Sequence, residues 1–153
     1  MELNALPRPI RSDLAKVDRL IAQSLKTTDP FLRRWVNPLT CVNGKRVRPV
    51  LVLLTARQVG RVDGRILALA AAVEMLHAAT LVHDDILDNA EERRHQKTLN
   101  FKWGNERSVL MGDFLLAATF RLMTRAIPME ILESVAEVAG TVCQGQIRET
   151  PHR

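Results

Sequence analysis

The stretch from Arg65 to Glu92 contains neither glycine nor proline, and nearly every position before its end is apolar. This pattern predicts a long helix, from about Asp63 to Ala90. The longest almost uncharged run, Ile66 to Val82, is interrupted by Glu74 and His77. These polar interruptions favour the buried helix of a globular core over a membrane span.

The predicted helix ends in three carboxylates, Asp84, Asp85 and Asp88. At 100° per residue, Asp84 and Asp88 lie about 40° apart, whereas Asp85 lies about 100° from Asp84. One helix face therefore carries His77, Leu81, Asp84 and Asp88 in line. Because like charges at i and i+4 repel, a bound Mg²⁺ is one explanation, since this ion takes one or two carboxylates with waters and phosphate oxygens. Solvated acids at the open end of a buried helix are the other.

The rest of the chain predicts more helices, because alanine and leucine are abundant and no strand-like alternation occurs. Ser12 is expected to cap the first helix, and Gly112 to let a later helix, which also carries Asp113, pack closely. The helices are expected over about Asp13–Lys26, Pro30–Val36, Pro49–Val59 (closed by Gly60) and Arg107–Ala126, and from Pro128 to near Pro151. We therefore predict one all-α domain, residues 1–153, of about six helices around one core.

Composition narrows the class of protein. A hydrophobic content of 46% and a charged content of 25% are typical of a globular domain. Cys41 and Cys143 are far apart, which indicates neither a zinc site nor a disulfide framework, so a reducing, cytoplasmic location is expected. The segment from Met1 to Arg11 lacks the apolar region of a signal peptide. The net charge of +5 favours a polyanionic partner, but no nucleic-acid motif accompanies it and aromatics make up only 4%. We therefore predict a small diphosphate as partner and no nucleic acid.

Two basic segments are candidates for anion binding. Lys45, Arg46 and Arg48 gather between Gly44, which suits a turn, and Pro49, which suits the first turn of a helix. The free N–H groups and the dipole at a helix N-terminus already favour an anion, so cations there are unfavourable without one. A solvated basic turn is the alternative. Similarly, the charged connector 91–97, which includes Arg93 and Arg94, would by itself be a solvated face.

Taken in order, these motifs resemble those of the trans-isoprenyl diphosphate synthases, or polyprenyl synthetases. The resemblance covers the chain from about Gly44 to Glu149. It rests on Gly44-Lys-Arg-Val-Arg-Pro49, Asp84-Asp-x-x-Asp88, Arg93-Arg94, Trp103-Gly-Asn105 and Gly112-Asp-Phe-Leu-Leu116. Any one of these motifs is weak alone, but the ordered set is specific. The resemblance implies an all-α prenyltransferase fold that joins isopentenyl diphosphate head-to-tail to an allylic prenyl diphosphate.

The resemblance also implies roles for individual residues. Asp84 and Asp88, supported by Asp85, would be Mg²⁺ ligands that hold the allylic diphosphate, and Arg93 would contact that diphosphate. The isopentenyl diphosphate would be held by Lys45, Arg48, His77 and Arg94. In the segment Gly145-Gln-Ile-Arg-Glu149, Gln146 would bind substrate and Glu149 would join the metal shell. Ala79 and Thr80, both small, would leave room for a product of twenty carbons or more, and on the helix wheel Thr80 is expected to face the pocket.

The physical chemistry agrees with these roles. Loss of diphosphate from an allylic carbon leaves a delocalised cation and places several negative charges on the leaving group. Metal ions and arginine stabilise such charges in a dry pocket, and apolar helix walls exclude water.

The sequence also departs from the family pattern. His95 and Gln96 follow the two arginines where glycine is more frequent. No second Asp-rich motif exists, because Asp113 is the only aspartate after Asp88, and family members are usually about twice this length. Three interpretations remain open: a transferase that completes its site by self-association or with a second subunit, a non-catalytic or regulatory diphosphate-binding subunit, and a purely structural helical bundle.

Overall fold

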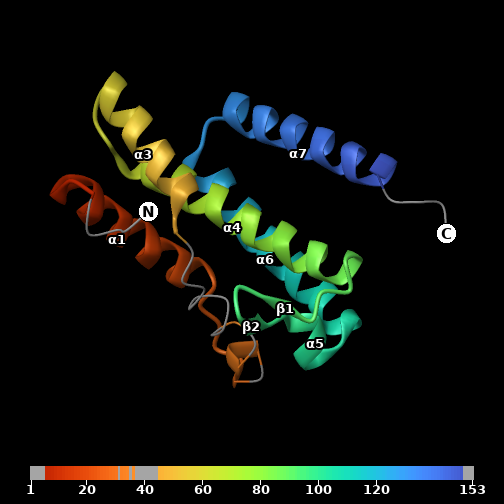
Figure 1. Cartoon of the computed structure of the whole chain (residues 1–153). Helices are drawn as coiled ribbons and strands as arrows, with labels where there is room; N and C mark the ends of the chain where they lie inside the picture. The colour runs from red at the N-terminus through yellow and green to blue at the C-terminus, as the bar shows by residue number, and fades with distance from the viewer. Residues whose placement is uncertain (1–5, 31, 35, 37–44, 150–153) are drawn as a thin grey trace.

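The computed structural model describes residues 6–30, 32–34, 36 and 45–149, and it confirms the all-α class (Figure 1). Within this part of the chain the helices are α1 (Arg8–Ser24), α3 (Val47–Val59), α4 (Gly64–Leu87), α5 (Leu99–Trp103), α6 (Asn105–Ala126) and α7 (Met129–Glu149). Residues 30, 32–34 and 36 are also helical, where a short helix was predicted. Two strands, β1 (Glu92–Arg93) and β2 (Gln96–Lys97), form an antiparallel hairpin that the sequence analysis did not predict.

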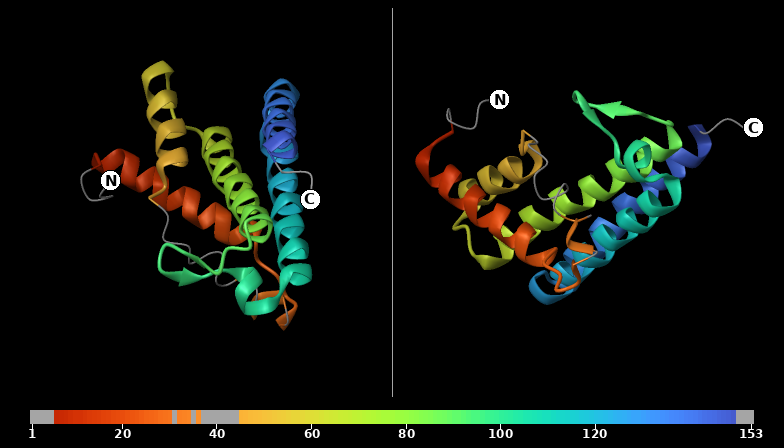
Figure 2. Two further views of the ribbon diagram at one scale, coloured as in Figure 1. Left: turned by 45° about the vertical axis from the view of Figure 1, so that its right-hand side comes forward. Right: turned by 90° about the horizontal axis from the view of Figure 1, so that it is seen from below.

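Helix α4 is the centre of the fold. It packs against α6 on one side and against α1 and α3 on the other (Figure 2). The Asp63 side chain caps it by accepting hydrogen bonds from the backbone N–H groups of Arg65 and Ile66, at 2.9 and 3.0 Å. By length and hydropathy α4 could span a membrane, but the core helix of a globular protein passes the same test. Its burial among four other helices confirms the predicted role as the core helix.

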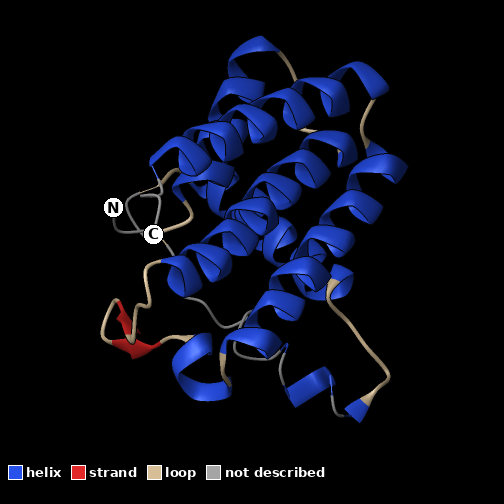
Figure 3. Cartoon of the chain, turned by 90° about the vertical axis from the view of Figure 1, so that its right-hand side faces the viewer, coloured by secondary structure: helices blue, strands red, loops and turns tan. Residues whose placement is uncertain are grey.

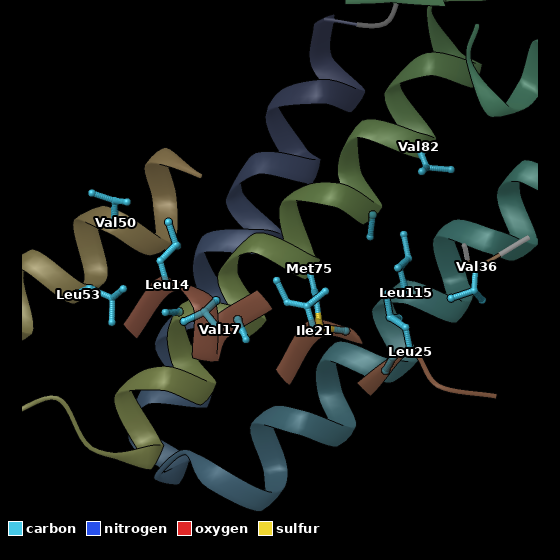
Figure 4. Close-up of a cluster of buried hydrophobic side chains, with 14 of the residues drawn as sticks. Leu14, Val17, Ile21, Leu25, Val36, Val50, Leu53, Met75, Val82 and Leu115 are labelled. Carbon is cyan, nitrogen blue, oxygen red and sulfur yellow. The ribbon is translucent and has the colours of Figure 1, made fainter. Parts of the chain in front are cut away.

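The hydrophobic core lies where α1, α3, α4 and α6 meet (Figure 4). Each of these helices contributes a large side chain that is almost completely buried: Val17, Leu53, Met75 and Leu115. Burial of each such side chain contributes roughly 1.5–3 kcal/mol to stability. Small residues on α4, including Ala71 and Ala79, are also fully buried, which allows neighbouring helices to approach it closely.

The start of α1 differs from the prediction. The helix begins at Arg8 after Pro7, so Ser12 lies inside it and is not its cap. Proline suits the first helical turn because the missing N–H would have no partner there. Asp13, the predicted first residue, is instead buried and accepts hydrogen bonds from Lys16 and Arg57. Burial alone would raise the pKa of this carboxyl, but these two cations lower it below its usual value, and the pair with Arg57 ties α1 to α3.

Gly112 lies where α6 packs closely against His83 of α4, as its sequence context predicted. A Cβ atom at this position would lie 2.1 Å from Nε2 of His83 on α4. The same nitrogen is 3.3 Å from the carbonyl oxygen of Val109. The two helices therefore pack around the His83 ring, and only glycine leaves room for it.

We expect Gly112→Ala to lower the free energy of unfolding by about 1–3 kcal/mol, because the His83 ring must move out of a packed interface. The matched control is Gly140→Ala on α7, where an added Cβ meets nothing within 4 Å. That change should stabilise the helix by up to about 1 kcal/mol. Urea unfolding measures both. In a His83→Ala background the penalty at Gly112 should disappear, and its persistence would contradict the proposed steric cause.

Helix α7 lies along the edge of the bundle, and none of its residues is fully buried (Figure 1). Its contact with the rest of the described chain is mainly with α6. Large apolar side chains on it, including Ile131, Val138 and Val142, are exposed to solvent. This helix therefore presents an unpartnered apolar face.

Candidate active site

A cavity of about 130 Å³ lies between α4, α1, α6, the start of α3 and the β1–β2 hairpin. It brings together four residues that the sequence analysis assigned to one diphosphate: Lys45, Arg48, His77 and Arg94. They come from three separate segments of the chain. The rest of the wall is mostly apolar and includes Ile21, Leu25, Met75, Leu81 and Leu115. The cavity therefore combines a cationic side with a hydrophobic one.

Only some of the cations in this wall are available to a ligand. The half-buried Arg46 makes ion pairs with Asp18 at 3.0 Å and Glu74 at 3.1 Å. Lys45, Arg48 and Arg94, by contrast, make no hydrogen bond or ion pair with any described residue. Arg46 thus neutralises the acids beside the cavity, and an uncompensated positive charge remains.

The His77 side chain is half-buried within this cationic wall. Burial is the main cause that lowers its pKa below the usual value, and the nearby charge of Arg48 lowers it further. Arg93 and Arg94 act in the same direction, whereas Glu74 opposes them. His77 is therefore neutral at pH 7 in the free protein, where it can donate or accept a hydrogen bond without adding charge.

The three acids at the end of α4 separate as the helix wheel predicted. Asp84 is half-buried and Asp88 is exposed, and neither side chain pairs with a cation in the described part of the chain. Both follow His77 and Leu81, which line the cavity, along the same helix face. Asp85 turns away and is 8% exposed. Two adjacent carboxylates with room for waters are a suitable donor set for Mg²⁺.

The hairpin that carries Arg93 and Arg94 joins α4 to α5 at one end of the bundle (Figure 3). Arg93 pairs with Gln96 across it, so Arg94 and His95 form a two-residue loop. Both loop residues adopt left-handed backbone conformations, with φ of 53° and 63°. This turn directs Arg94 to the cavity.

The sequence profile described as "Polyprenyl synthetase" matches residues 29–153. The chain belongs to the polyprenyl synthetase family. It is 32% identical over 147 residues to octaprenyl diphosphate synthase of Escherichia coli K12, covering 96% of this chain and 46% of that protein. It is 34% identical over 141 residues to heptaprenyl diphosphate synthase component 2 of Bacillus subtilis, covering 92% of this chain and 40% of that protein.

A solved structure of the polyprenyl synthase of Caulobacter crescentus CB15, described as complexed with calcium and isoprenyl diphosphate, is also similar. It superposes with a TM-score of 0.86 at 35% identity, covering 95% of this chain and 44% of that one. The predicted family and fold are therefore confirmed. This polyprenyl synthetase chain spans about half the length of the relatives it matches.

In this polyprenyl synthetase, Asp85 and Arg93 form an ion pair. Nε of Arg93 donates to Oδ1 of Asp85 at 2.6 Å. Sequence analysis assigned both residues to the allylic side but did not predict this pair. The bond uses only Nε, so the terminal guanidinium nitrogens of Arg93 are not engaged by Asp85. Asp85 would then act by orienting Arg93.

The left-handed turn at Arg94 and His95 is a position that suits glycine. Two-residue hairpin loops of this type need positive φ at both positions and favour glycine at the second. Here His95 occupies that position, with its side chain exposed and 3.8 Å from Glu92. A residue with a Cβ atom costs roughly 1–2 kcal/mol in this conformation.

We expect His95→Gly to raise the free energy of unfolding by about 0.5–1 kcal/mol, because relief of this strain exceeds the greater flexibility of glycine in the unfolded chain. The control is His95→Ala, which removes the ring but keeps the Cβ atom and should give no such gain. Urea unfolding of both variants tests this. Equal stability of the two variants would contradict a backbone origin.

Several predicted residues of the site are not brought to the cavity. Gln146 and Glu149 lie on exposed turns of α7. Among the described residues, no group of three histidine, cysteine or acidic side chains is placed to hold a metal ion. The role of Glu149 in the metal shell stays a prediction.

The two residues assigned to product length also lie differently from the expectation. Ala79 is fully buried in the core, whereas Thr80 is exposed and donates a hydrogen bond to the carbonyl oxygen of His77. Neither residue lines the cationic cavity. The reason is that the cavity opens on the side of α4 next to Ala78. The role in product length stays a prediction, and Thr80 is the better position to test it because Ala79→Phe would overpack the core.

Proposed function

We propose that this protein binds isopentenyl diphosphate in the cationic cavity and an allylic prenyl diphosphate through Mg²⁺ at Asp84 and Asp88. It condenses the two head-to-tail into a polyprenyl diphosphate. The observation that carries this proposal is the convergence of Lys45, Arg48 and Arg94 on one cavity beside the helix face that ends in the two acids. A purely structural bundle would not need three uncompensated cations there.

The chemistry follows from the charges of this chain. Lys45, Arg48 and Arg94 bind the diphosphate of the nucleophilic substrate, while the terminal nitrogens of Arg93 contact that of the allylic one. When bound, Mg²⁺ supplies positive charge to the departing diphosphate. The apolar wall, including Met75 and Leu115, excludes water from the carbon atoms that react. The calcium and isoprenyl diphosphate named for the Caulobacter crescentus structure support a divalent ion and a prenyl diphosphate as ligands.

The proposal includes an assembly, formed either by copies of this chain or with a second subunit. The exposed apolar face of α7 supports self-association or a second subunit that covers it. The alternative function is a non-catalytic diphosphate-binding subunit. One observation favours it as the second candidate: the Bacillus subtilis relative is described as one component of a synthase.

A condensation assay with radiolabelled isopentenyl diphosphate separates these two functions. For a transferase, the label should pass into an apolar product only when both an allylic diphosphate and Mg²⁺ are present. Titration calorimetry with each diphosphate runs in parallel. Binding without condensation would support the non-catalytic subunit, whereas absence of binding would contradict both functions.

His77 gives a pH-dependent prediction. Its pKa lies below the usual 6.5 in the free protein, and a nearby diphosphate should raise it. Because the bound state holds the proton more tightly, affinity contributed by His77 should increase as the pH falls toward and below 6.5. Calorimetry in buffers of different ionisation enthalpy should detect proton uptake near pH 6.5. This component should vanish in His77→Gln, and uptake unchanged in that variant would exclude His77 as its source.

A further inference from the structure

The side-chain amide of Asn100, at the start of α5, joins two backbone carbonyls at the end of α4. Its Nδ2 donates to the carbonyl oxygen of Asp85 at 3.2 Å and to that of Ala90 at 3.0 Å. Thr98 assists, since its hydroxyl donates to the same Ala90 oxygen at 2.7 Å. These bonds close the segment 85–90 onto the segment that follows the hairpin. Neither Thr98 nor Asn100 was among the residues selected from the sequence.

While Nδ2 of Asn100 donates to these two carbonyls, the side-chain oxygen of the same amide has no donor to bind in the described part of the chain. Its Oδ1 is buried and has no hydrogen-bond partner among the described residues. Rotating the amide by 180° would place Oδ1 against two carbonyl oxygens, which is worse. A buried acceptor without a partner is unfavourable by the desolvation of that group. The two bonds that Asn100 donates therefore outweigh this penalty. Their effect is to fix the position of the segment 85–90.

This segment connects both halves of the candidate allylic site. Asp88 lies within it, and the hairpin with Arg93 and Arg94 leaves from its end. The base of the hairpin is closed by the backbone N–H of Thr98, which donates to the carbonyl oxygen of Glu91 at 3.1 Å. From the opposite side, Arg93 bonds the Asp85 carboxylate. A shift of this segment would move the acids and the arginines relative to each other.

We propose that Asn100 is a positioning residue that holds the acidic end of α4 in register with the arginine hairpin. Thr98 assists it. The inference rests on the proposed function, because it assigns Asn100 to the geometry of the same allylic diphosphate site. Asn100 touches no substrate and acts only through the backbone of Asp85 and Ala90.

The test compares Asn100→Asp with Asn100→Ala in the full chain. Aspartate keeps the shape of the side chain but sets a carboxylate against two carbonyl oxygens, whereas alanine only removes the donor. If donation is what matters, Mg²⁺-dependent binding of an allylic diphosphate, without isopentenyl diphosphate present, should weaken about threefold for alanine and about tenfold or more for aspartate. If the side chain only fills space, the order should reverse. The control Gln58→Glu makes the same chemical change at an exposed position of α3 and should alter nothing.

A second measurement distinguishes a positioning role of Asn100 from a general destabilisation of the fold. Metal-free binding of inorganic pyrophosphate, to which Lys45, Arg48 and Arg94 contribute, should weaken by a smaller factor than Mg²⁺-dependent binding in both variants, because only Arg94 of these three cations lies on the hairpin. Equal losses with and without Mg²⁺, the reversed order, or wild-type affinity would each overturn the inference. If melting shows that Asn100→Asp is unfolded, Asn100→Ala and Thr98→Val carry the test, and wild-type Mg²⁺ dependence in both overturns it. Absence of binding by the unmodified protein would instead count against the proposed function.

Discussion

Asp88→Ala is expected to weaken Mg²⁺-dependent binding of an allylic diphosphate by about a hundredfold or more while the protein stays folded. Asp84 and Asp88 are one helical turn apart, and neither pairs with a cation in the part of the chain that the structure describes. Removing one carboxylate halves the charge available to the ion, and a bound metal contributes several kcal/mol to a phosphate site. Thermal stability should be unchanged or slightly higher, because repulsion between two like charges is relieved.

The controls for this prediction separate charge from shape. Asp88→Asn keeps the size of the side chain but not its charge and should lose nearly as much affinity as alanine. Asp113→Ala removes another exposed acid, on α6, and should leave binding intact. Calorimetry at fixed Mg²⁺ measures all three, and circular dichroism confirms the fold. Wild-type affinity in Asp88→Ala would show that Asp84 and Asp88 do not form the metal site.

The second large effect is expected on the oligomeric state of the protein. Val138→Lys combined with Val142→Lys should convert an oligomer into a monomer, because it places two charges in the centre of the apolar face of α7. Both valines are exposed in the single chain, at 64% and 59%. Desolvating two lysines in an interface costs more than such a contact can return. Sedimentation velocity at micromolar concentration measures the change.

A matched variant tests whether this face is responsible. Ala136→Lys with Gln144→Lys adds the same charge on the opposite side of α7 and should preserve the oligomer. If both pairs of substitutions dissociate it equally, net charge and not the apolar face controls assembly. If the unmodified protein is a well-folded monomer, self-association is contradicted.

The long elements of this fold were predictable because their signals are local and repeated. The apolar run before Asp84 indicated α4 to within three residues at its end. The cationic wall was also predictable, since motifs of fixed order and spacing identified Lys45, Arg48 and Arg94 although they are far apart in sequence.

The predictions that were wrong or incomplete depended on tertiary contacts. The hairpin was missed because neither Arg94 nor His95 is a residue that usually adopts a left-handed turn. Asp13 was assigned to the first turn of a helix because nothing in the local sequence indicates that it would be buried and paired with Arg57. For Thr80, the helix wheel gave the correct face relative to Asp84 but could not show on which side of α4 a cavity forms.

The internal pairing of Arg46 has a consequence for ligand exchange. Because Asp18 and Glu74 neutralise Arg46, fewer unpaired cations repel one another in the cavity when no ligand is present. Mutual repulsion in the empty state is thereby lower than it would be if Arg46 were also unpaired, which lowers the free-energy cost of releasing a bound diphosphate. On the proposed function, the cavity would both bind a diphosphate and release it, as repeated turnover and reversible capture each require.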